Sequence, residues 1–585
     1  MKNTDFVVRF AGEGGQGVVT SADGFASANA QVGYHVQTFS TFPSQIRGGP
    51  VWTQTRISTE PIRSSGDDLD VLVAFNEYAY NEHKSEVREG GVIIFDSGTF
   101  ELEGVENSFG MAFDDLARST GNARAANMVV MGALAYLVEI DQSILEQFVT
   151  KRFTRGRPND QEIIESNIKA LTLGRIEAEN SGFIIGQMAD AIPPEGEQVL
   201  INGNVALSLG AMAAGIDVYV GYPISPATPI LIFMENNLPG PGKFAYQSTS
   251  EIESITSIVG AAFAGKKAMT ATAGPGFTLM GEGIGLAWMA EIPVVVVDVQ
   301  RGGPSTGLPT DVEQSDLNIA CYGGHGDSPR VVLAVSDVED CFYTAIEAVN
   351  IARKYSVPVF VLSDQAIATR IEAFNEPDLK TICKDVELDL SPVPSHKPYD
   401  LSSGDGLSRH RAPGTRIEDG RYPVVTGLEH DESGHPSGDA VNHIAMTKKR
   451  RNKLKTLADE LPVPEVYGAD SGDVLLVGWG STKGPLLEAV EELSNNGDAL
   501  SALHIKHINP LPNGLDAIFS RFNSVYVVEM NDGGVYGYGQ VAGVLRARFA
   551  DARIKGINKT AARRWKVSEI IERVKARRAE ETATA

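Results

Sequence analysis

Residues 294–307 read VVVVDVQRGGPSTG, a β-branched run that leads directly into a glycine-rich loop. A run this short, preceded by Pro293, is typical of a buried strand. Comparable runs occur at Asp217–Tyr222 and Pro358–Leu362, and helix-like segments separate them over residues 199–374: Asn204–Ala214, Glu251–Ala264 and Phe342–Tyr355. This alternation predicts a parallel sheet that helices cover on both faces.

Further segments flank this unit, and a chain of 585 residues is too long for a single core. Residues 1–190 show an α/β pattern and end at the proline-rich boundary IPPEGEQ. Residues 376–470 have little periodicity and are interpreted as an irregular connector. Strand patterns at Asp473–Gly478, Ala502–Ile508 and Ser524–Glu529 mark a further α/β domain. The predicted fold class is α/β with four parts: 1–190, 191–375, 376–470 and 471–585.

The composition, with 42% hydrophobic and 22% charged residues, is that of a globular protein. The net charge of −24 argues against nucleic acid or an anionic membrane as the main partner. No apolar run approaches the roughly 18 residues of a membrane span and the N-terminus lacks a signal-peptide pattern, so we expect a cytoplasmic protein. The three cysteines lack a CxxC spacing, so we expect no metal site on this chain.

The connector contains a strongly basic run at Lys448–Lys455, KKRRNKLK. It is either a nucleic-acid patch or the solvated face of a helix that begins near Val441. The acidic character of the whole chain favours the solvated helix face.

Gly12-x-Gly14-x-x-Gly17 lies between a predicted strand, Phe6–Phe10, and a predicted helix, Val18–Ala30. The spacing matches the dinucleotide-binding fingerprint, which makes a nicotinamide-dependent dehydrogenase one candidate. The next strand ends in Thr38-Phe39-Ser40-Thr41 without the carboxylate that would bind the ribose, so NAD is disfavoured. The loop is then either an anion contact at a helix N-terminus or a tight strand-to-helix turn.

Phe42–Pro50, FPSQIRGGP, follows that strand and places Ser44 and Arg47 beside a Gly-Gly-Pro turn. Parallel α/β proteins bind ligands at the carboxyl ends of their strands. Ser44 and Arg47 are therefore candidate ligand contacts, and a plain surface loop is the alternative.

Three loops of the second unit carry further candidates. Tyr222-Pro223-Ile224-Ser225-Pro226 follows a strand, and its prolines present the Ser225 hydroxyl, whose alternative role is that of an N-cap. Gly274-Pro275-Gly276 forms a flexible turn before another helix. Arg301, in a loop that also holds Thr306, offers a guanidinium fork suited to a carboxylate.

Ser250-Glu251 opens a helix whose next turns are apolar and small, including Ile255, Ile258 and Gly260. A carboxylate at a helix N-terminus often only compensates the helix dipole. Because Glu251 leads directly into a tightly packed helix, we expect its carboxylate to be buried.

In this order the motifs resemble the 2-oxoacid:ferredoxin oxidoreductases, the family that includes pyruvate and 2-oxoglutarate synthases. The matching positions are Gly12–Gly17, Ser44–Gly49, Tyr222–Pro226, Ser250-Glu251, Gly274–Gly276 and Arg301. One departure is Ser225, where threonine is usual, although the hydroxyl is retained. The likeness extends over nearly the whole chain.

The resemblance implies an α subunit with a fused γ-type domain at 1–190, a pyrimidine-binding thiamine-diphosphate domain at 191–375 and a transketolase-C-like domain at 471–585. It implies that Glu251 contacts the aminopyrimidine of thiamine diphosphate and promotes removal of the thiazolium proton. It also implies that Arg301 binds the substrate carboxylate. The other implied residues are the substrate contacts Ser225, Thr306, Ser44 and Arg47, and the cofactor contacts Tyr222, Pro223, Ile224, Gly274, Pro275 and Gly276.

The resemblance further implies coenzyme-A-dependent oxidative decarboxylation of a 2-oxoacid, or the reverse carboxylation, with ferredoxin exchanging single electrons. The family's Gly-Asp-Gly…Asn motif for diphosphate and Mg²⁺ is missing, because Gly404-Asp405-Gly406 follows no strand and is interpreted as a turn. We therefore expect Mg²⁺ and a [4Fe-4S] cluster on a separate β subunit, in an (αβ)2 heterotetramer. The γ–α fusion and Thr426–Gly434 favour 2-oxoglutarate. The alternatives are pyruvate, a branched-chain 2-oxoacid, or a non-catalytic assembly subunit.

Overall fold

The computed structural model describes residues 2–42, 48–382, 391–408, 410–420, 422 and 424–584. The chain divides into two compact units, residues 1–201 with 369–376 and residues 202–368 with 377–585. The return of residues 369–376 to the first unit has no counterpart in the predicted boundaries. The four-part division remains our proposal.

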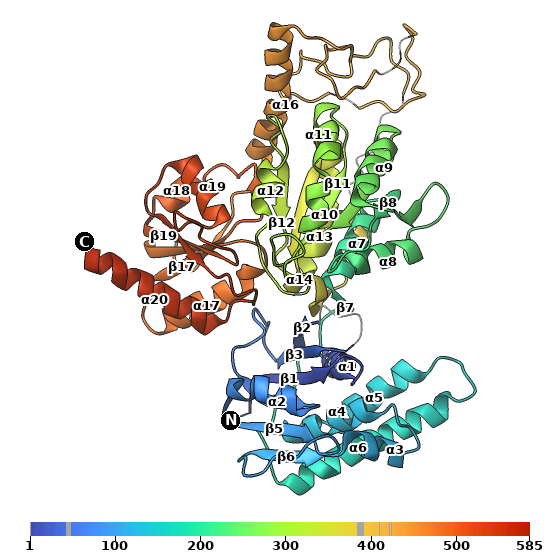
Figure 1. Ribbon diagram of the computed structural model, residues 1–585, viewed down its shortest axis with the longest axis vertical. Helices are drawn as coiled ribbons and strands as arrows, with labels where there is room; N and C mark the ends of the chain where they lie inside the picture. Colours follow the sequence, from blue (N-terminus) through green and yellow to red (C-terminus); the bar gives the residue numbers. More distant parts are fainter. Residues whose placement is uncertain are drawn as a thin grey trace. The chain divides into compact units, whose positions relative to one another are not determined.

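The first unit is built on an eight-stranded sheet in the order β6-β5-β4-β1-β3-β2-β14-β7 (Figure 1). Strands β1, β4, β5 and β6 pair in parallel, whereas β3 is antiparallel to both β1 and β2. Its elements are β1 (Asp5–Glu13), α1 (Val18–Ala30), β2 (His35–Thr41), β3 (Pro50–Ser58), β4 (Leu69–Ala74), α2 (Glu77–His83), η1 (Lys84–Glu86), β5 (Val87–Asp96), β6 (Ser108–Met111), α3 (Phe113–Ser119), α4 (Ala126–Leu137), α5 (Gln142–Phe153), α6 (Asp160–Ser181), β7 (Gln198–Asn202) and β14 (Ile371–Asn375).

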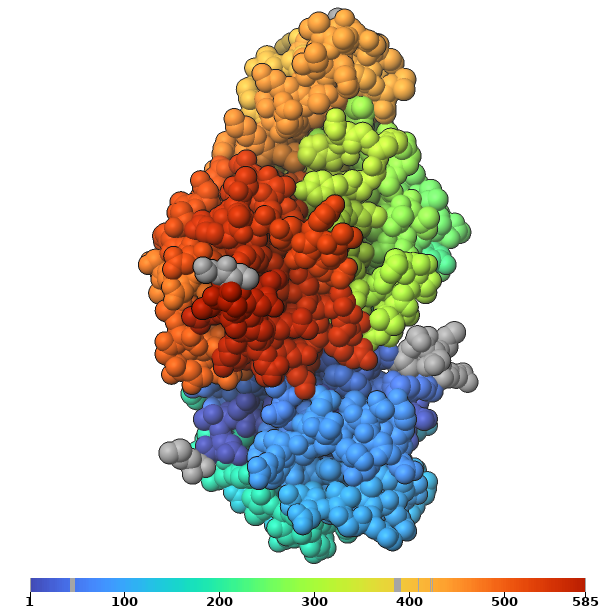
Figure 2. All heavy atoms as spheres, turned by 60° about the vertical axis from the view of Figure 1, so that its left-hand side comes forward, coloured from blue at the N-terminus to red at the C-terminus, as the bar shows by residue number. Residues whose placement is uncertain are grey.

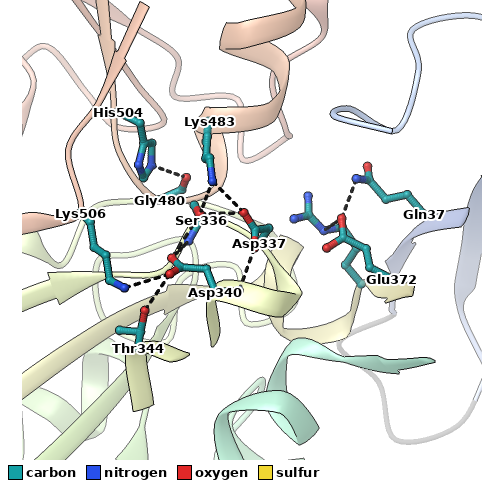
Figure 3. Close-up of polar contacts among 11 residues, drawn as sticks. Gln37, Ser336, Asp337, Asp340, Thr344, Glu372, Gly480, Lys483, His504 and Lys506 are labelled. Carbon is teal, nitrogen blue, oxygen red and sulfur yellow. Dashed lines mark hydrogen bonds and ion pairs between the residues drawn. The ribbon is translucent and has the colours of Figure 1, made fainter. Parts of the chain in front are cut away.

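The two faces of this sheet carry separate apolar cores. Val8 of β1 belongs to the core that α1, α4, α5 and α6 complete, including Phe25 and Leu134. Val7, the preceding residue, belongs to the opposite core, which includes Tyr80 of α2. This division follows from the two-residue period of a strand, which sends successive side chains to opposite faces. The sheet extends to β14, where Gln37 of β2 donates a hydrogen bond to Glu372 (Figure 3).

The second unit contains the parallel sheet predicted from residues 199–374. Its strand order is β18-β12-β13-β11-β10-β8-β9, with parallel pairing from β12 to β9 and an antiparallel β18 at one edge. The elements are α7 (Gly203–Ala213), β8 (Val218–Gly221), α8 (Thr228–Asn237), β9 (Phe244–Gln247), α9 (Glu251–Phe263), β10 (Ala268–Thr272), α10 (Gly274–Leu279), α11 (Gly281–Met289), β11 (Val295–Gln300), α12 (Leu317–Tyr322), β12 (Val331–Ala334), α13 (Val338–Tyr355), β13 (Val359–Asp364), α14 (Gln365–Thr369) and α15 (Leu379–Ile382).

The rest of the second unit is a long connector helix and a five-stranded sheet in the order β15-β17-β16-β19-β20. In Figure 2 this C-terminal part, in red, lies against residues 202–368, in green, and Gln314 joins them by donating from its side chain to the Trp479 carbonyl at 2.9 Å. The elements are α16 (Ala440–Glu460), β15 (Val466–Tyr467), β16 (Gly472–Gly478), η2 (Gly480–Thr482), α17 (Lys483–Asn495), β17 (Leu500–His504), β18 (His507–Asn509), α18 (Leu515–Phe519), β19 (Phe522–Glu529), α19 (Gln540–Phe549), β20 (Ile554–Asn558) and α20 (Val567–Thr584).

The strand predicted at Ala502–Ile508 is divided between the two sheets of this unit. Strand β17 ends at His504 in the five-stranded sheet, and β18 begins at His507 in the seven-stranded sheet. At this crossing Lys506 pairs with Asp340 at 2.9 Å, and Lys483 pairs with Asp337 at 3.0 Å (Figure 3). The prediction of one continuous strand is wrong, because the chain leaves the five-stranded sheet after His504 and enters the seven-stranded sheet at His507. The apolar residues Ile505 and Ile508 are both buried at this crossing.

The basic run of α16 corrects a second expectation. Lys449, Arg450 and Lys453 are buried rather than solvated, while the other basic residues of the run are exposed. Glu291, 5% exposed, pairs with Lys449 at 2.7 Å and also with Lys453, and Glu429 pairs with Arg450 at 2.8 Å. Buried charges need such partners, and neither acid is near the run in sequence.

Two smaller expectations concern the connector and the membrane. The predicted turn at Gly404–Gly406 is confirmed, and the Asp405 side chain accepts a hydrogen bond from the Leu407 N–H at 2.9 Å. None of the helices that the structure describes combines the length and the apolar character needed to cross a membrane.

Candidate functional site

The candidate residues of the second unit meet at the carboxyl edge of its parallel sheet. Strands β8, β10 and β11 are neighbours in one direction, so the loops that follow them emerge at the same edge. These loops hold Tyr222–Pro226, Gly274–Gly276 and Arg301–Gly307. Helix α9, which begins with Glu251, follows β9 at that edge.

Glu251 is buried, as predicted, with 4% of its surface exposed. The N-terminus of α9 is capped by other groups: the Ser250 hydroxyl accepts from the Glu253 N–H at 3.3 Å, and the Glu253 carboxylate accepts from the Thr249 N–H at 2.7 Å. The Glu251 carboxylate accepts no hydrogen bond from the described residues. Capping therefore does not explain why a carboxylate is buried at Glu251.

Gly276 forms the wall against which the Glu251 carboxylate lies. A Cβ at Gly276 would overlap both that carboxylate and the Thr272 hydroxyl, so the close approach requires glycine. The predicted flexible turn at Gly274–Gly276 is wrong, because these residues form the first turn of α10, with Pro275 in the first turn where its missing N–H costs nothing.

Arg301 is also buried, with 6% of its surface exposed. One guanidinium nitrogen, Nη1, donates to the Ser225 carbonyl at 2.7 Å, and the buried Nε has no partner among the described residues. Burial lowers the pKa of Arg301, against the opposing charges of two nearby acids. Ser225 thus holds the guanidinium through its backbone and leaves other donors free.

The loops also decide the roles of the two predicted hydroxyl contacts. Ser225 is exposed and is not an N-cap, because α8 begins at Thr228 with Ala227 before it. Thr306 is exposed on a loop that a bridge between Gly302 and Leu308 closes. Both hydroxyls are accessible to a ligand.

Two acids near Arg301, Asp298 and Asp316, had no role in the sequence interpretation. Asp298 lies within β11 and is fully buried, and neither of its oxygens has a hydrogen-bond partner among the described residues. Asp316 precedes α12, and its carboxyl oxygen would be 2.7 Å from a Cβ at Gly274. The one available signal was a charged residue inside the β-branched run 294–299 of a buried strand.

The pKa values of these acids are raised. Burial, followed by the charge of Asp316, raises the pKa of Asp298 well above its usual range, although Arg301 opposes this. Burial raises the pKa of Asp316 to about 6, again against the effect of Arg301. The site is therefore built around one cation and two acids that resist ionisation together.

A cavity of about 1040 Å³ adjoins these groups within the second unit. Its walls come from the loop after Arg301, including Glu313 and Asp316, and from residues 532–547, including Asp532 and Tyr536. Gln540 connects the two walls, because its side-chain amide donates to the Ser315 carbonyl at 2.7 Å. Asp316 therefore faces a space that water can enter.

The predicted sites of the first unit are only partly described. Ser44 and Arg47 lie outside the described residues. The loop Gly12–Gly17 is a tight strand-to-helix turn, with Gly15 and Gly17 at positive φ and the Gln16 side chain accepting from the Glu13 N–H at 2.7 Å. The anion contact stays a prediction.

Matches to family models cover both units. Residues 209–449 match the model described as pyruvate flavodoxin/ferredoxin oxidoreductase, thiamine-diphosphate binding, and residues 7–177 match the pyruvate ferredoxin/flavodoxin oxidoreductase model. Fold, site and these matches define a thiamine-diphosphate-binding oxidoreductase subunit.

Individual relatives give the family. The chain is 34% identical to 2-oxoglutarate oxidoreductase subunit KorA of Mycobacterium tuberculosis, over 94% of this chain and 89% of that protein. It is 38% identical to 2-oxoglutarate synthase subunit KorA of Methanothermobacter marburgensis, over 58% of this chain and 90% of that protein. The solved 2-oxoglutarate:ferredoxin oxidoreductase from Magnetococcus marinus, with 2-oxoglutarate, coenzyme A and succinyl-CoA bound, is 36% identical with a TM-score of 0.91, over 98% of this chain and 100% of that chain. The chain belongs to the 2-oxoacid:ferredoxin oxidoreductase family and matches α subunits over most of its length.

Proposed function

We propose that this chain, with a β subunit, converts 2-oxoglutarate and coenzyme A to succinyl-CoA and carbon dioxide with ferredoxin as the electron acceptor, or runs the reverse carboxylation. The family gives the class of reaction. The choice of 2-oxoglutarate rests on the names of the relatives and on the ligands bound in the Magnetococcus marinus enzyme. Pyruvate and branched-chain 2-oxoacids are the alternative substrates.

The observation that carries the proposal is that Glu251 is buried beside Gly276 and that its carboxylate accepts no hydrogen bond within the described part of the chain. These two residues fit the aminopyrimidine ring of thiamine diphosphate, because the ring has a nitrogen for the carboxylate to contact and a glycine at position 276 leaves room for that carboxylate. When bound, thiamine diphosphate supplies the electron sink for decarboxylation. Glu251 holds and releases a proton at the ring nitrogen, as a general acid–base. Further cofactor contacts in this proposal are Tyr222, Pro223, Ile224, Gly274 and Pro275.

Arg301 binds the carboxylate of the 2-oxoacid in this proposal. Its guanidinium is fixed by the Ser225 carbonyl, and its buried Nε has no partner among the residues that the structure describes, so it can donate a charge-assisted hydrogen bond, which is strong in a buried setting. The remaining proposed substrate contacts are the hydroxyls of Ser225 and Thr306, together with Ser44 and Arg47.

The β subunit holds Mg²⁺ and the [4Fe-4S] cluster in this proposal, within an (αβ)2 assembly. The sequence supports this division, because it has no strand-borne Gly-Asp-Gly…Asn motif and no clustered cysteines. Ferredoxin binds mainly on the partner in this proposal, because this chain has a net charge of −24 and ferredoxins are usually acidic too.

The test is a dye-reduction assay on the chain co-purified with its β partner. We expect coenzyme-A-dependent reduction of methyl viologen, with kcat/KM for 2-oxoglutarate at least about tenfold above that for pyruvate or 3-methyl-2-oxobutanoate. A higher kcat/KM with pyruvate would instead make pyruvate the proposed substrate. Reduction of NAD in the absence of dye would support the dehydrogenase instead.

A further inference from the structure

The guanidinium of Arg301 interacts with two nearby carboxyl groups, those of Asp298 and Asp316. Asp298 is fully buried within β11, and its register neighbours Thr272 and Leu362 bring no charge. Asp316 is held in place from its backbone, where its N–H donates to the Gln300 side chain at 3.2 Å. Each acid interacts with the charge of Arg301 and with the other acid.

Neither acid is paired directly with the arginine. Among the described residues, no hydrogen bond or ion pair joins Arg301 to Asp298 or Asp316, and both Asp298 oxygens and one Asp316 oxygen are buried without a partner. Two adjacent buried carboxylates repel each other, and a single cation offsets one of them. This repulsion favours one proton on the pair when the site is empty, and Asp298, which is fully buried with a pKa raised well above its usual range, is the better position for it.

We propose that the Asp298–Asp316 pair takes up a second proton when the substrate carboxylate binds Arg301, so that substrate and proton enter the site together. The proposal rests on the proposed function, because it takes Arg301 as the carboxylate-binding group. A bound carboxylate replaces Asp316 as the counter-ion of Arg301 and places a second negative charge beside that of Asp316, which protonation of Asp316 removes. The proton comes from water, since Asp316 lines the cavity of about 1040 Å³.

The surroundings of the pair favour this proton uptake. The charged groups that act on Asp316 are Arg301 and Glu313 from its own loop, and Asp532 lines the opposite wall of the same cavity. Two of these three groups are acids, so an incoming carboxylate finds one cation to compensate it. Asp298 and Asp316 are positioning residues in this scheme, because they act on the substrate through Arg301.

The pH dependence of binding follows from linkage. The pKa of Asp316 in the empty site is about 6. Below this pH the Asp316 carboxyl is protonated in both the empty and the occupied site, so the affinity for the substrate does not change with pH. Above it, the empty site loses the proton that the occupied site retains, so affinity for the anionic substrate falls as pH rises. KM for 2-oxoglutarate should therefore rise by about 7- to 25-fold between pH 6.5 and pH 8.

The decisive measurement is calorimetric titration of the intact αβ complex with 2-hydroxyglutarate, a dicarboxylate that lacks the reactive keto group. Titrations at pH 7.5 in phosphate and in Tris, which differ in ionisation enthalpy, give the number of protons taken up. We expect about 0.5–1 proton per site in the unmodified complex. Asp316→Asn should reduce the uptake below about 0.2 and bring KM at pH 8 close to its value at pH 6.5.

Two neighbouring substitutions serve as comparisons. Asp298→Asn preserves the shape of the protonated acid, so uptake should persist on Asp316. Asp532→Asn removes an acid from the far wall of the cavity, and its uptake and pH profile should match those of the unmodified complex. These variants separate a specific proton site from a general loss of negative charge.

The proposal is overturned if the unmodified complex binds 2-hydroxyglutarate without proton uptake, a result that needs no variant to fold. It is also overturned if Asp316→Asn retains both the uptake and the pH-dependent KM. Turnover of 2-oxoglutarate in the dye assay with either result leaves the proposed function standing. Absence of turnover with every 2-oxoacid, together with absence of binding, removes both.

Discussion

Replacing Glu251 by glutamine isolates its carboxylate as a chemical group. Glutamine has the same shape, and the carboxylate accepts no hydrogen bond from the described residues, so the exchange leaves the cap of α9 intact. General acid–base groups contribute about 10²–10⁴-fold, which corresponds to about 3–5 kcal/mol of transition-state stabilisation. We expect Glu251→Gln to lower kcat by that factor and to change Tm by no more than about 2 °C.

The assay compares dye reduction and thermal unfolding for the variant and the unmodified αβ complex. Glu253→Gln is the matched control, because Glu253 lies two residues away on the same helix and accepts the hydrogen bonds of Thr249. That control should lower Tm slightly and leave kcat unchanged. If Glu251→Gln retained kcat within about threefold, Glu251 would not be the acid–base group.

Three further changes test other parts of the second unit. Gly276→Ala places a Cβ where the Glu251 carboxylate lies, so turnover should fall together with about 1–3 kcal/mol of stability, measured by dye assay and urea unfolding. Glu291→Gln leaves two buried lysines without a counter-ion and should cost about 3–5 kcal/mol in urea unfolding; a loss under about 1 kcal/mol would contradict this. Burial raises the pKa of Asp337, but Lys483 and hydrogen bonds outweigh it and lower the pKa to about 2, so this acid adds stability above about pH 4 that is lost as pH falls toward 2. Lys483→Met should lower Tm at pH 7 and flatten Tm between pH 4 and pH 2, and an unchanged slope would count against the contact.

Most elements of the fold follow from periodicity along the chain. The runs at 217–222, 294–299 and 358–362 are strands of one parallel sheet, because continuous β-branched stretches suit strands buried on both faces. Strand β3 was missed, since it begins at Pro50 directly after a segment that looked like a turn, and its antiparallel pairing with β1 and β2 depends on distant residues.

The candidate site was predictable where a motif follows a strand. Tyr222–Pro226 follows β8 directly, and Arg301 follows β11 directly. Both strands run in the same direction in one sheet, so the two motifs are expected at its carboxyl edge. What the local sequence could not give was the contact between Arg301 and the Ser225 carbonyl, because it joins residues 76 positions apart. The closeness of Glu251 to Gly276 is likewise a property of packing between α9 and α10.

The amino-acid sequence by itself determined the α/β class, the parallel sheet and the positions of Glu251 and Arg301 at the ends of its elements, because local periodicity and turn chemistry act over a few residues. The tertiary structure alone decided which charges are buried and which of them meet. Lys449 and Lys453 appeared solvent-facing until Glu291 was brought beside them, and Asp298 and Asp316 gained significance only when the fold brought their charges near Arg301. The physical reason is that the energy of a charge depends on its burial and on its partners in space, and chain separation determines neither.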